Sequence, residues 1–229
     1  MNRMPRMIFA LGVLCCCPSL PSQTSAIPPP ATMIKMVVRL MGPGVKPGTF
    51  AALPKTIYRA GAHYARIEDA PDARQGMQKL TVIAEPDAYS VNLIDKKGTH
   101  AIDQGGTNDL HLPVVLPLDP KRLLATLDRL EFGDELDFFE QAGAAKEAGP
   151  IINAKPTDAY RLKTADGSAV LVVRSGTQVP VTLSWDSHDG TYTYEFITYQ
   201  EVPFDASLFV KPAGIAYKEI PPDTSLDKG

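Results

Sequence analysis

The chain has 229 residues, a formal net charge of −3 and a hydrophobic fraction of 44%. This length is sufficient for one sizeable core, and the sequence shows neither an internal repeat nor a long low-complexity linker, so we expect a single domain. The acidic balance argues against a nucleic-acid-binding protein, which needs a basic surface to neutralise phosphates.

The first 26 residues have the order of a secretory signal peptide. Arg3 and Arg6 precede the apolar run Met7–Leu14, and a polar stretch follows that ends at the small residue Ala26. Because a bilayer-spanning helix needs about 20 apolar residues, this run does not indicate a membrane-spanning protein. We predict cleavage after Ala26 and export to the periplasm, with a mature net charge of −5 because two arginines and no acids are removed.

All three cysteines, Cys15, Cys16 and Cys17, lie within this leader. Lipidation of one of them is the alternative to simple cleavage, but the residue before a lipidated cysteine is normally small, and Leu14 precedes the first. The mature chain is therefore expected to contain no thiol for a disulfide, a soft metal or nucleophilic catalysis.

The first part of the mature chain reads as strands. Pro28 to Pro30 favour an extended spacer, and Thr32–Met41 then alternates apolar and polar residues, which favours a strand over a competing helix. Glycine and proline turns separate the further strands that we expect, which are Lys55–Glu68 with a break near Gly61, Met77–Glu85, Tyr89–Asp95 and Thr99–Asp103.

The middle of the chain changes to helical spacing. Asp119 can cap a helix that starts at Pro120 and carries on one face Leu123, Leu124, Leu127 and Leu130. Asp134 can cap a second, shorter helix, which ends before Gly143 and carries Leu136, Phe138 and Phe139.

Strands return in the last third of the chain, at Tyr160–Thr164 and Ala169–Arg174. The stretch Val179–Tyr199 then has two alternating runs around Asp189-Gly190, which is the strongest short-range signal for a β-hairpin. The apolar face of this hairpin must cover either a packed core or an apolar ligand, since it carries Trp185, Tyr192, Tyr194 and Phe196.

Two sets of motifs carry a resemblance to a known family. The C-terminal set is Tyr160-Arg-Leu162, Pro180-Val-Thr-Leu-Ser-Trp185, Gly190-Thr-Tyr-Thr-Tyr194 and Leu208-Phe209-Val-Lys-Pro212-Ala-Gly214. The N-terminal set is Ile57-Tyr58-Arg59-Ala-Gly61, Tyr64-Ala-Arg66-Ile-Glu68 and Gly98-Thr-His100-Ala-Ile-Asp103. Together they resemble uncharacterised bacterial envelope proteins related to the periplasmic lipoprotein carriers, the LolA-like superfamily of outer-membrane lipoprotein sorting.

The resemblance implies an α+β fold in residues 27–218, followed by a polar tail at 219–229. The fold would be a single curved antiparallel sheet, an open half-barrel wrapped over one or two helices, whose concave side holds acyl chains in true carriers. The chain departs from the carriers at its start, where a proline spacer and a strand replace their long first helix. Neither Arg59 nor Arg66 lies in a motif that matches the carriers' functional arginine.

Candidate catalytic chemistry is sparse, so neither an enzyme nor a cofactor is expected. His100, Asp103 and His111 could ligate a metal, but residues of this kind near a glycine-rich loop often occur by chance. Ser187-His188-Asp189 contains the residue types of a hydrolytic triad, yet neighbours on a turn cannot direct their side chains at one another in the required chain.

Two functions remain after an enzyme is set aside. The first is a periplasmic binding or carrier protein for an acyl chain, a lipoprotein or another hydrophobic ligand, with a wall formed by Leu171, Val173, Leu183, Trp185, Tyr194 and Phe196. The second is an envelope interaction module, in which helices fill that face and an exposed strand edge or loop binds a partner protein. An empty face favours the ligand, whereas filling by Leu123, Leu127 and Phe138 favours the module.

Overall fold

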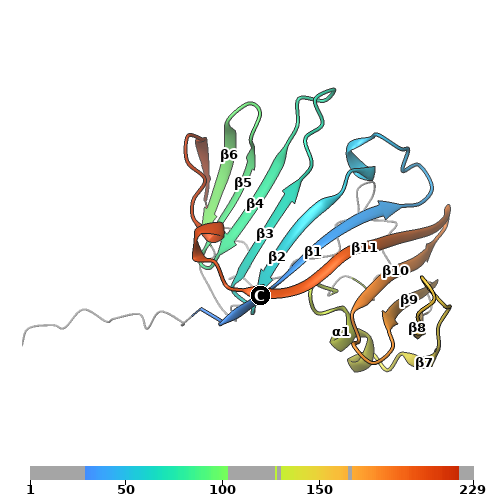
Figure 1. The fold of residues 1–229 in the computed structure, drawn as a ribbon. Helices are drawn as coiled ribbons and strands as arrows, with labels where there is room; N and C mark the ends of the chain where they lie inside the picture. The colour runs from blue at the N-terminus through green and yellow to red at the C-terminus, as the bar shows by residue number, and fades with distance from the viewer. Residues whose placement is uncertain (1–28, 103–126, 128–129, 165–166, 222–229) are drawn as a thin grey trace, which may run out of the picture.

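The structure is a computed structural model that describes residues 29–102, 127, 130–164 and 167–221. Within these residues, twelve strands form one open sheet with a single α-helix beside it (Figure 1), which confirms the predicted fold class. The strand order is β12-β6-β5-β4-β3-β2-β1-β11-β10-β9-β8-β7. All neighbours pair antiparallel except β12 and β6, which are parallel. No helix in this part of the chain is both long and apolar enough to cross a membrane.

The elements follow one another from the N-terminal to the C-terminal half in a nearly continuous series of hairpins. The first half contains β1 (Thr32–Met41), the 3-10 turn η1 (Phe50–Ala52), β2 (Lys55–Ala60), β3 (Tyr64–Asp69), β4 (Lys79–Ala84), β5 (Asp87–Asn92) and β6 (Lys97–Ile102). The second contains α1 (Glu135–Gln141), β7 (Ala145–Ala148), β8 (Thr157–Thr164), β9 (Gly167–Arg174), β10 (Pro180–Ser187), β11 (Gly190–Pro203), the 3-10 turn η4 (Ala206–Phe209) and β12 (Ala216–Ile220).

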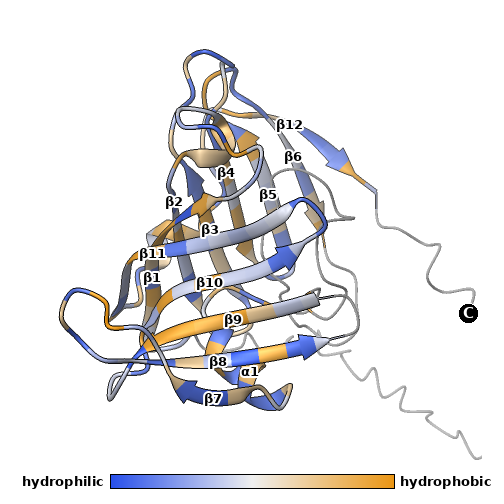
Figure 2. Ribbon diagram, turned by 90° about the vertical axis from the view of Figure 1, so that its right-hand side faces the viewer, coloured by the Kyte–Doolittle hydropathy of each residue, from blue (hydrophilic) through white to orange (hydrophobic). Residues whose placement is uncertain are grey.

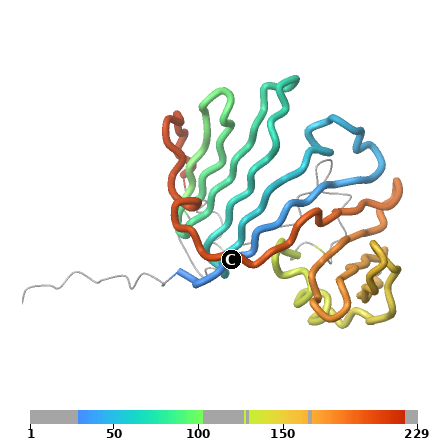
Figure 3. The backbone as a smooth tube through the Cα atoms, viewed as in Figure 1, coloured from blue at the N-terminus to red at the C-terminus, as the bar shows by residue number. Residues whose placement is uncertain are grey.

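The sheet bends where its two halves join. The 14-residue strand β11 pairs with β1 on one side and with β10 on the other, and its register with β1 shifts between Val37 and Val38. Ile197 is the extra residue at this shift, and such a bulge bends a strand and increases its twist. As a result, β7 to β10 curl away from the plane of β2 to β6 (Figure 3).

The main core lies on one face of the bent sheet, here called the inner face. Alternating residues of β1 point there and are almost fully buried, namely Met36, Val38 and Leu40. Phe139 of α1 and the preceding residues Leu127, Leu130 and Phe132 pack against them in the same cluster. Burial of each such side chain contributes about 1.5–3 kcal/mol, so this cluster dominates the stability of the fold.

The opposite, outer face is covered by the C-terminal segment. Phe209 of η4 packs against Met33 and Tyr64, and Tyr217 of β12 contacts Tyr89 edge to face at 5.6 Å. The chain thus crosses the outer face after β11 and adds β12 to the far edge of the sheet. Figure 2 shows β12 as a largely hydrophilic strand beside β6.

Most of the predicted strands are confirmed. The first has the predicted bounds, Thr32–Met41, and the predicted hairpin is the β10–β11 pair. The run Lys55–Glu68 forms β2 and β3, with Gly61 in the turn between them at φ 57°. The short second helix is confirmed as α1, but Asp134 makes no capping hydrogen bond through its side chain.

Other elements were not predicted or are not described. The sequence did not indicate β7, η1, η4 or β12, and β12 includes the first two residues of the segment expected as a polar tail. The helix predicted to start at Pro120 lies outside the described residues except for Leu127 and Leu130, both of which are fully buried.

Candidate functional site

The six residues predicted to form a ligand-binding wall all lie on the inner face of β9, β10 and β11. They belong to the main core cluster, and each is at most 7% exposed: Leu171, Val173, Leu183, Trp185, Tyr194 and Phe196. Phe132 meets Tyr194 edge to face, with ring centroids 5.2 Å apart. The sequence therefore predicted correctly that these residues share a face, and the structure covers that face with the chain's own side chains.

Two of the three residues expected to cover the wall if it is filled lie within the described part of the chain. Leu127 is fully buried against the wall, and Phe138 packs against the same cluster from α1. Leu123 lies outside the described residues. Among the described residues, side chains of the chain itself therefore cover the wall.

An open cleft of about 700 Å³ lies beside the wall, where β1 begins and β2 ends. Its volume falls in the range of about 300–1,000 Å³ that is typical of small-molecule sites. The residues that line it are Pro30, Thr32, Met33, Ile34, Arg59, Gly61, Ala62, Gly133, Asp134, Val179, Tyr199 and Glu201. Sequence reasoning missed this cleft, because it brings together β1, β2, β11 and the turn before α1.

The floor of the cleft is apolar and continues into the wall. Ile34 and Tyr199 line the cleft and also pack against the main core cluster. The ring of Tyr199 lies 6.0 Å from that of Phe196, a wall residue, measured between centroids. The cleft and the wall are therefore parts of one apolar surface, on which the described residues leave the cleft open and cover the wall.

A buried ion pair forms one side of the cleft. Arg59 pairs through Nη1 with Glu131, and both side chains are largely buried. Nε of Arg59 also donates to the carbonyl oxygen of Gly61 at 2.8 Å. Gly133 passes next to this arginine at φ 94°, where a Cβ atom would lie 3.3 Å from Arg59 Cγ, so the position favours glycine on both counts.

Glu135 is the most perturbed acid beside the cleft. It lines a smaller pocket of about 210 Å³, which shares Gly133, Asp134, Val179 and Tyr199 with the main cleft. Its Oε1 accepts a hydrogen bond from the Gly133 N–H at 2.9 Å, and Tyr199 interacts with the carboxyl from β11. Complete burial raises the pKa of Glu135 to about 7.

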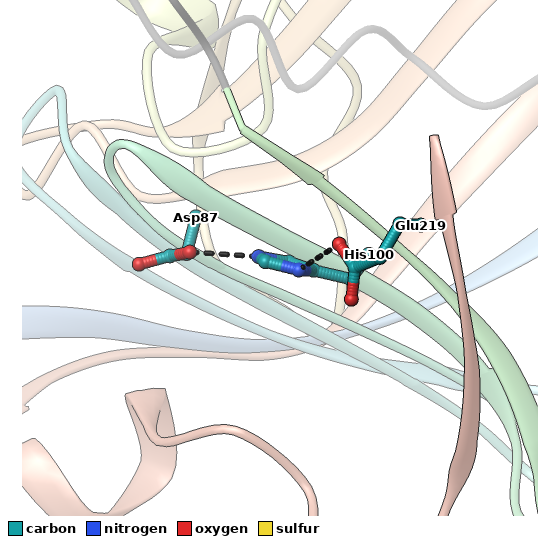
Figure 4. A network of polar contacts seen from close by, with 3 residues as sticks. All are labelled: Asp87, His100 and Glu219. Atoms are coloured by element: carbon teal, nitrogen blue, oxygen red, sulfur yellow. Dashed lines mark hydrogen bonds and ion pairs between the residues drawn. The ribbon is translucent and has the colours of Figure 1, made fainter. Parts of the chain in front are cut away.

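A second polar cluster lies on the outer face and joins three strands (Figure 4). Nε2 of His100 on β6 lies 2.7 Å from Oδ1 of Asp87 on β5, and its Nδ1 lies 2.6 Å from Oε2 of Glu219 on β12. The imidazole ring stacks on Tyr89 at 4.6 Å. Hydrogen bonding to Asp87, and then to Glu219, raises the pKa of His100 despite partial desolvation.

This cluster does not support the metal site considered from the sequence. Both ring nitrogens of His100 face carboxylates, and the other two candidate ligands, Asp103 and His111, lie outside the described residues. Within the described part of the chain, no group of three potential ligands is placed to hold a metal ion. The arrangement instead fastens β12 to the sheet edge.

The triad-like sequence at Ser187 forms the expected hairpin turn. Ser187 Oγ and His188 Nδ1 are 3.5 Å apart, at the limit of a hydrogen bond. The carboxylate of Asp189 accepts a hydrogen bond from the Tyr192 hydroxyl at 3.1 Å. The three side chains therefore do not form the relay of a hydrolase.

Comparisons with known proteins find distant similarities among solved structures and no matching family. No protein-family model matches the sequence, and no curated protein matches it. Among solved structures, the chain is similar to an uncharacterized conserved protein from Thermus thermophilus (10% identity, 83% of this chain and 91% of that chain covered, TM-score 0.48). It is also similar to a LolA superfamily protein from Nitrosomonas europaea (10% identity, 81% of this chain and 92% of that chain covered, TM-score 0.34). A third similar structure is the MucA/MucB complex of Pseudomonas aeruginosa (11% identity, 80% of this chain and 56% of that chain covered, TM-score 0.40). Each of these TM-scores is below 0.5 and each identity is 11% or less, so the similarities assign neither a family nor a ligand or an activity.

Proposed function

We propose that this protein binds a hydrophobic or amphipathic ligand in the bacterial cell envelope, as a periplasmic carrier or binding protein. The observation that carries the proposal is the open cleft of about 700 Å³, whose apolar floor runs without a break into the wall. The acyl or alkyl chain of this ligand, including one carried by a lipoprotein, would bind along Ile34, Val179 and Tyr199. Each methylene removed from water would contribute about 0.8 kcal/mol. No catalytic step is part of this function.

The wall residues would contact the ligand only if the side chains that cover them move. Leu127 and Phe132 pack on the same surface as Trp185 and Tyr194, so a chain that passes beyond the cleft must displace them. We therefore place the head and the first part of the ligand in the cleft. The six wall residues, Leu171, Val173, Leu183, Trp185, Tyr194 and Phe196, would receive the distal part of a longer chain.

The second candidate function is an envelope interaction module without a ligand. Two observations favour it: the wall is filled by the chain's own side chains, and β7 lies at the sheet edge with all four residues exposed. An exposed edge strand offers unpaired backbone groups to a strand from a partner protein. In this case the cleft would be a surface depression with no saturable binding.

Calorimetric titration of the mature chain with dodecyl ligands separates the two functions. We expect saturable binding, and we expect Ile34→Asp to weaken it by more than about tenfold, because a charge on the cleft floor is not compensated. Ile197→Asp is the matched control: Ile197 also lies on a strand, but it is 47% exposed and does not line the cleft. Circular dichroism of both variants verifies folding. If the wild-type protein gives no saturable heat with any dodecyl ligand, the interaction module replaces the carrier.

A further inference from the structure

The charged groups along one side of the cleft are mostly acidic. Four carboxylates line the cleft and the adjoining smaller pocket: Asp134, Glu135, Asp137 and Glu201. Among the described lining residues, Arg59 is the single cation, and it is already paired with Glu131. The acids that face the cleft are therefore not balanced by the described cation beside them.

Glu135 shows that this acidity is more than a solvated surface. It is 1% exposed; Oε1 accepts a hydrogen bond from Gly133 and Tyr199 interacts with the carboxyl, while Oε2 has no hydrogen bond of normal geometry from a described residue. Acidic residues in the first turn of a helix are favoured by the helix dipole, which explains an acid at this position. The dipole does not explain why a carboxyl is buried with an unsatisfied oxygen, which costs free energy unless a partner arrives.

Asp134 and Glu201 are placed nearer the mouth of the cleft. Asp134 precedes α1 but makes no capping bond; partial burial and then the charge of Asp137 raise its pKa, and the charge of Arg59 offsets this only in part. Glu201 is exposed on β11, where it accepts a hydrogen bond from the Thr32 hydroxyl at 2.6 Å. Asp134, which is repelled by Asp137, would gain from a nearby cation and would resist a nearby anion.

We infer that the ligand of this cleft is a cationic amphiphile, with an ammonium-type head beside Asp134, where the cleft adjoins the smaller pocket lined by Glu135, and an apolar chain lying on Ile34, Val179 and Tyr199. This inference rests on the proposed function and adds the charge of the ligand. Among the described lining residues, a fatty carboxylate or a phosphate head would find Arg59 as the single cation, and would have to compete with Glu131 for it. The charges of the cleft predict the head group of the ligand, and the apolar floor predicts its hydrocarbon chain.

Calorimetric titration of the full mature chain with two probes of equal chain length tests the head group. We expect dodecyltrimethylammonium to bind at least about tenfold more tightly than dodecanoate at neutral to mildly alkaline pH, below the micellar concentration of either. Asp134→Asn and Glu135→Gln should each lower the affinity for the ammonium probe several-fold. Both changes keep the size of the side chain, and Glu135→Gln removes a buried charge, so neither is expected to prevent folding.

Glu140→Gln is the matched control for general attraction to an acidic protein. Glu140 lies on the same short helix, is exposed, and does not line either pocket, so its removal changes net charge alone. Ammonium binding that is lost in Asp134→Asn and Glu135→Gln and kept in Glu140→Gln supports the inference. Equal or tighter binding of dodecanoate, or ammonium binding that all three variants keep, overturns it while the cleft remains a ligand site. Absence of binding by both probes overturns the proposed function as well.

Discussion

Glu135, the first residue of α1, interacts with Tyr199 on the inner face of β11, so that a fully buried carboxyl stands where the core opens into the cleft. Burial is the largest influence on both groups: it raises the pKa of Glu135 to about 7 and also raises the pKa of Tyr199. The contact joins the short helix to the sheet, and it makes the stability of the fold sensitive to the ionisation of Glu135.

Stability should therefore fall as the pH rises from the ordinary pKa of this carboxyl to its raised value. Between 4.5 and about 7 the folded protein retains the Glu135 proton, while the unfolded chain has released it, so unfolding gains from each rise in pH. The full effect is on the order of 3 kcal/mol and levels off above the folded-state pKa. Glu135→Gln should lose this dependence and be more stable than the wild type in mildly alkaline solution.

Urea unfolding across this pH range checks the prediction through the difference between wild type and variant. Glu140→Gln, on the exposed side of the same helix, should keep the wild-type slope. Parallel pH profiles for the wild type and Glu135→Gln would show that the carboxyl is solvated rather than buried.

The His100 cluster predicts a pH dependence of the same direction at the sheet edge, through a cation instead of a buried acid. The pKa of His100 is raised by Asp87 and Glu219, so its ion pairs are present at mildly acidic pH and are lost as the pH rises through the folded-state pKa. Tyr89 stacks on its imidazole ring, and Tyr217 and Lys211 in turn contact the ring of Tyr89. We expect β12 to be held more weakly at alkaline pH.

Hydrogen exchange of the β12 amides measures this effect directly. After correction for the intrinsic pH dependence of exchange, protection should decrease from mildly acidic to alkaline pH in the wild type, and should be low and nearly constant in His100→Gln. His188→Gln, in the exposed turn between β10 and β11, should behave like the wild type. Unchanged protection in His100→Gln at acidic pH would mean that backbone pairing with β6 alone holds the strand.

The strands that could be predicted are those whose two faces differ in environment. In β1 and in the β10–β11 hairpin, buried residues alternate with more exposed ones, so the local sequence alternates between apolar and polar residues and indicates a strand. By contrast, β7 is exposed at all four residues and has no alternation to detect. The strand β12 forms through pairing with β6, more than a hundred residues earlier, and local sequence cannot reveal such a partner.

The site could be predicted in part for the same reason. The wall residues share one face of three strands, and alternation was enough to group them. Leu127 and Phe132 cover that face through tertiary packing, which the local sequence does not reveal. Asp134 had a local interpretation as a helix cap and Glu135 had none, because the placement of α1 against β11 is what buries Glu135 beside a cleft.

Packing of Leu127 against the wall predicts a large cost for its truncation. The side chain is fully buried in the main cluster, so Leu127→Ala should destabilise the protein by about 2–5 kcal/mol through lost burial and the cavity that remains. Ile151, which is 78% exposed, is the matched control, and Ile151→Ala should change stability by less than about 0.5 kcal/mol. Chemical unfolding measures both. A small effect at Leu127 would mean that the inner face readily accepts a void, and would raise the prospect of a ligand there.

Trp185 provides the last prediction, which separates a ligand confined to the cleft from one that enters the wall. Its indole is 1% exposed and stacks on Tyr192 at 5.6 Å, toward the opposite end of β10 from the cleft residue Val179. Six residues of strand separate the two positions, which corresponds to about 20 Å. An octyl ligand in the cleft should therefore leave Trp185 fluorescence unchanged, whereas a hexadecyl ligand should shift it by displacing Leu127 and Phe132.

A second reporter, Tyr199→Trp combined with Trp185→Phe, makes a negative result informative. This reporter lines the cleft and should respond to ligands of both lengths. Phe196→Ala should enlarge the passage between cleft and wall, since Phe196 and Tyr199 lie side by side there, and should increase the Trp185 response to the longer chain. A response at position 199 without any response at Trp185, for every chain length, would limit the ligand to the cleft and leave the six-residue wall as a purely structural core.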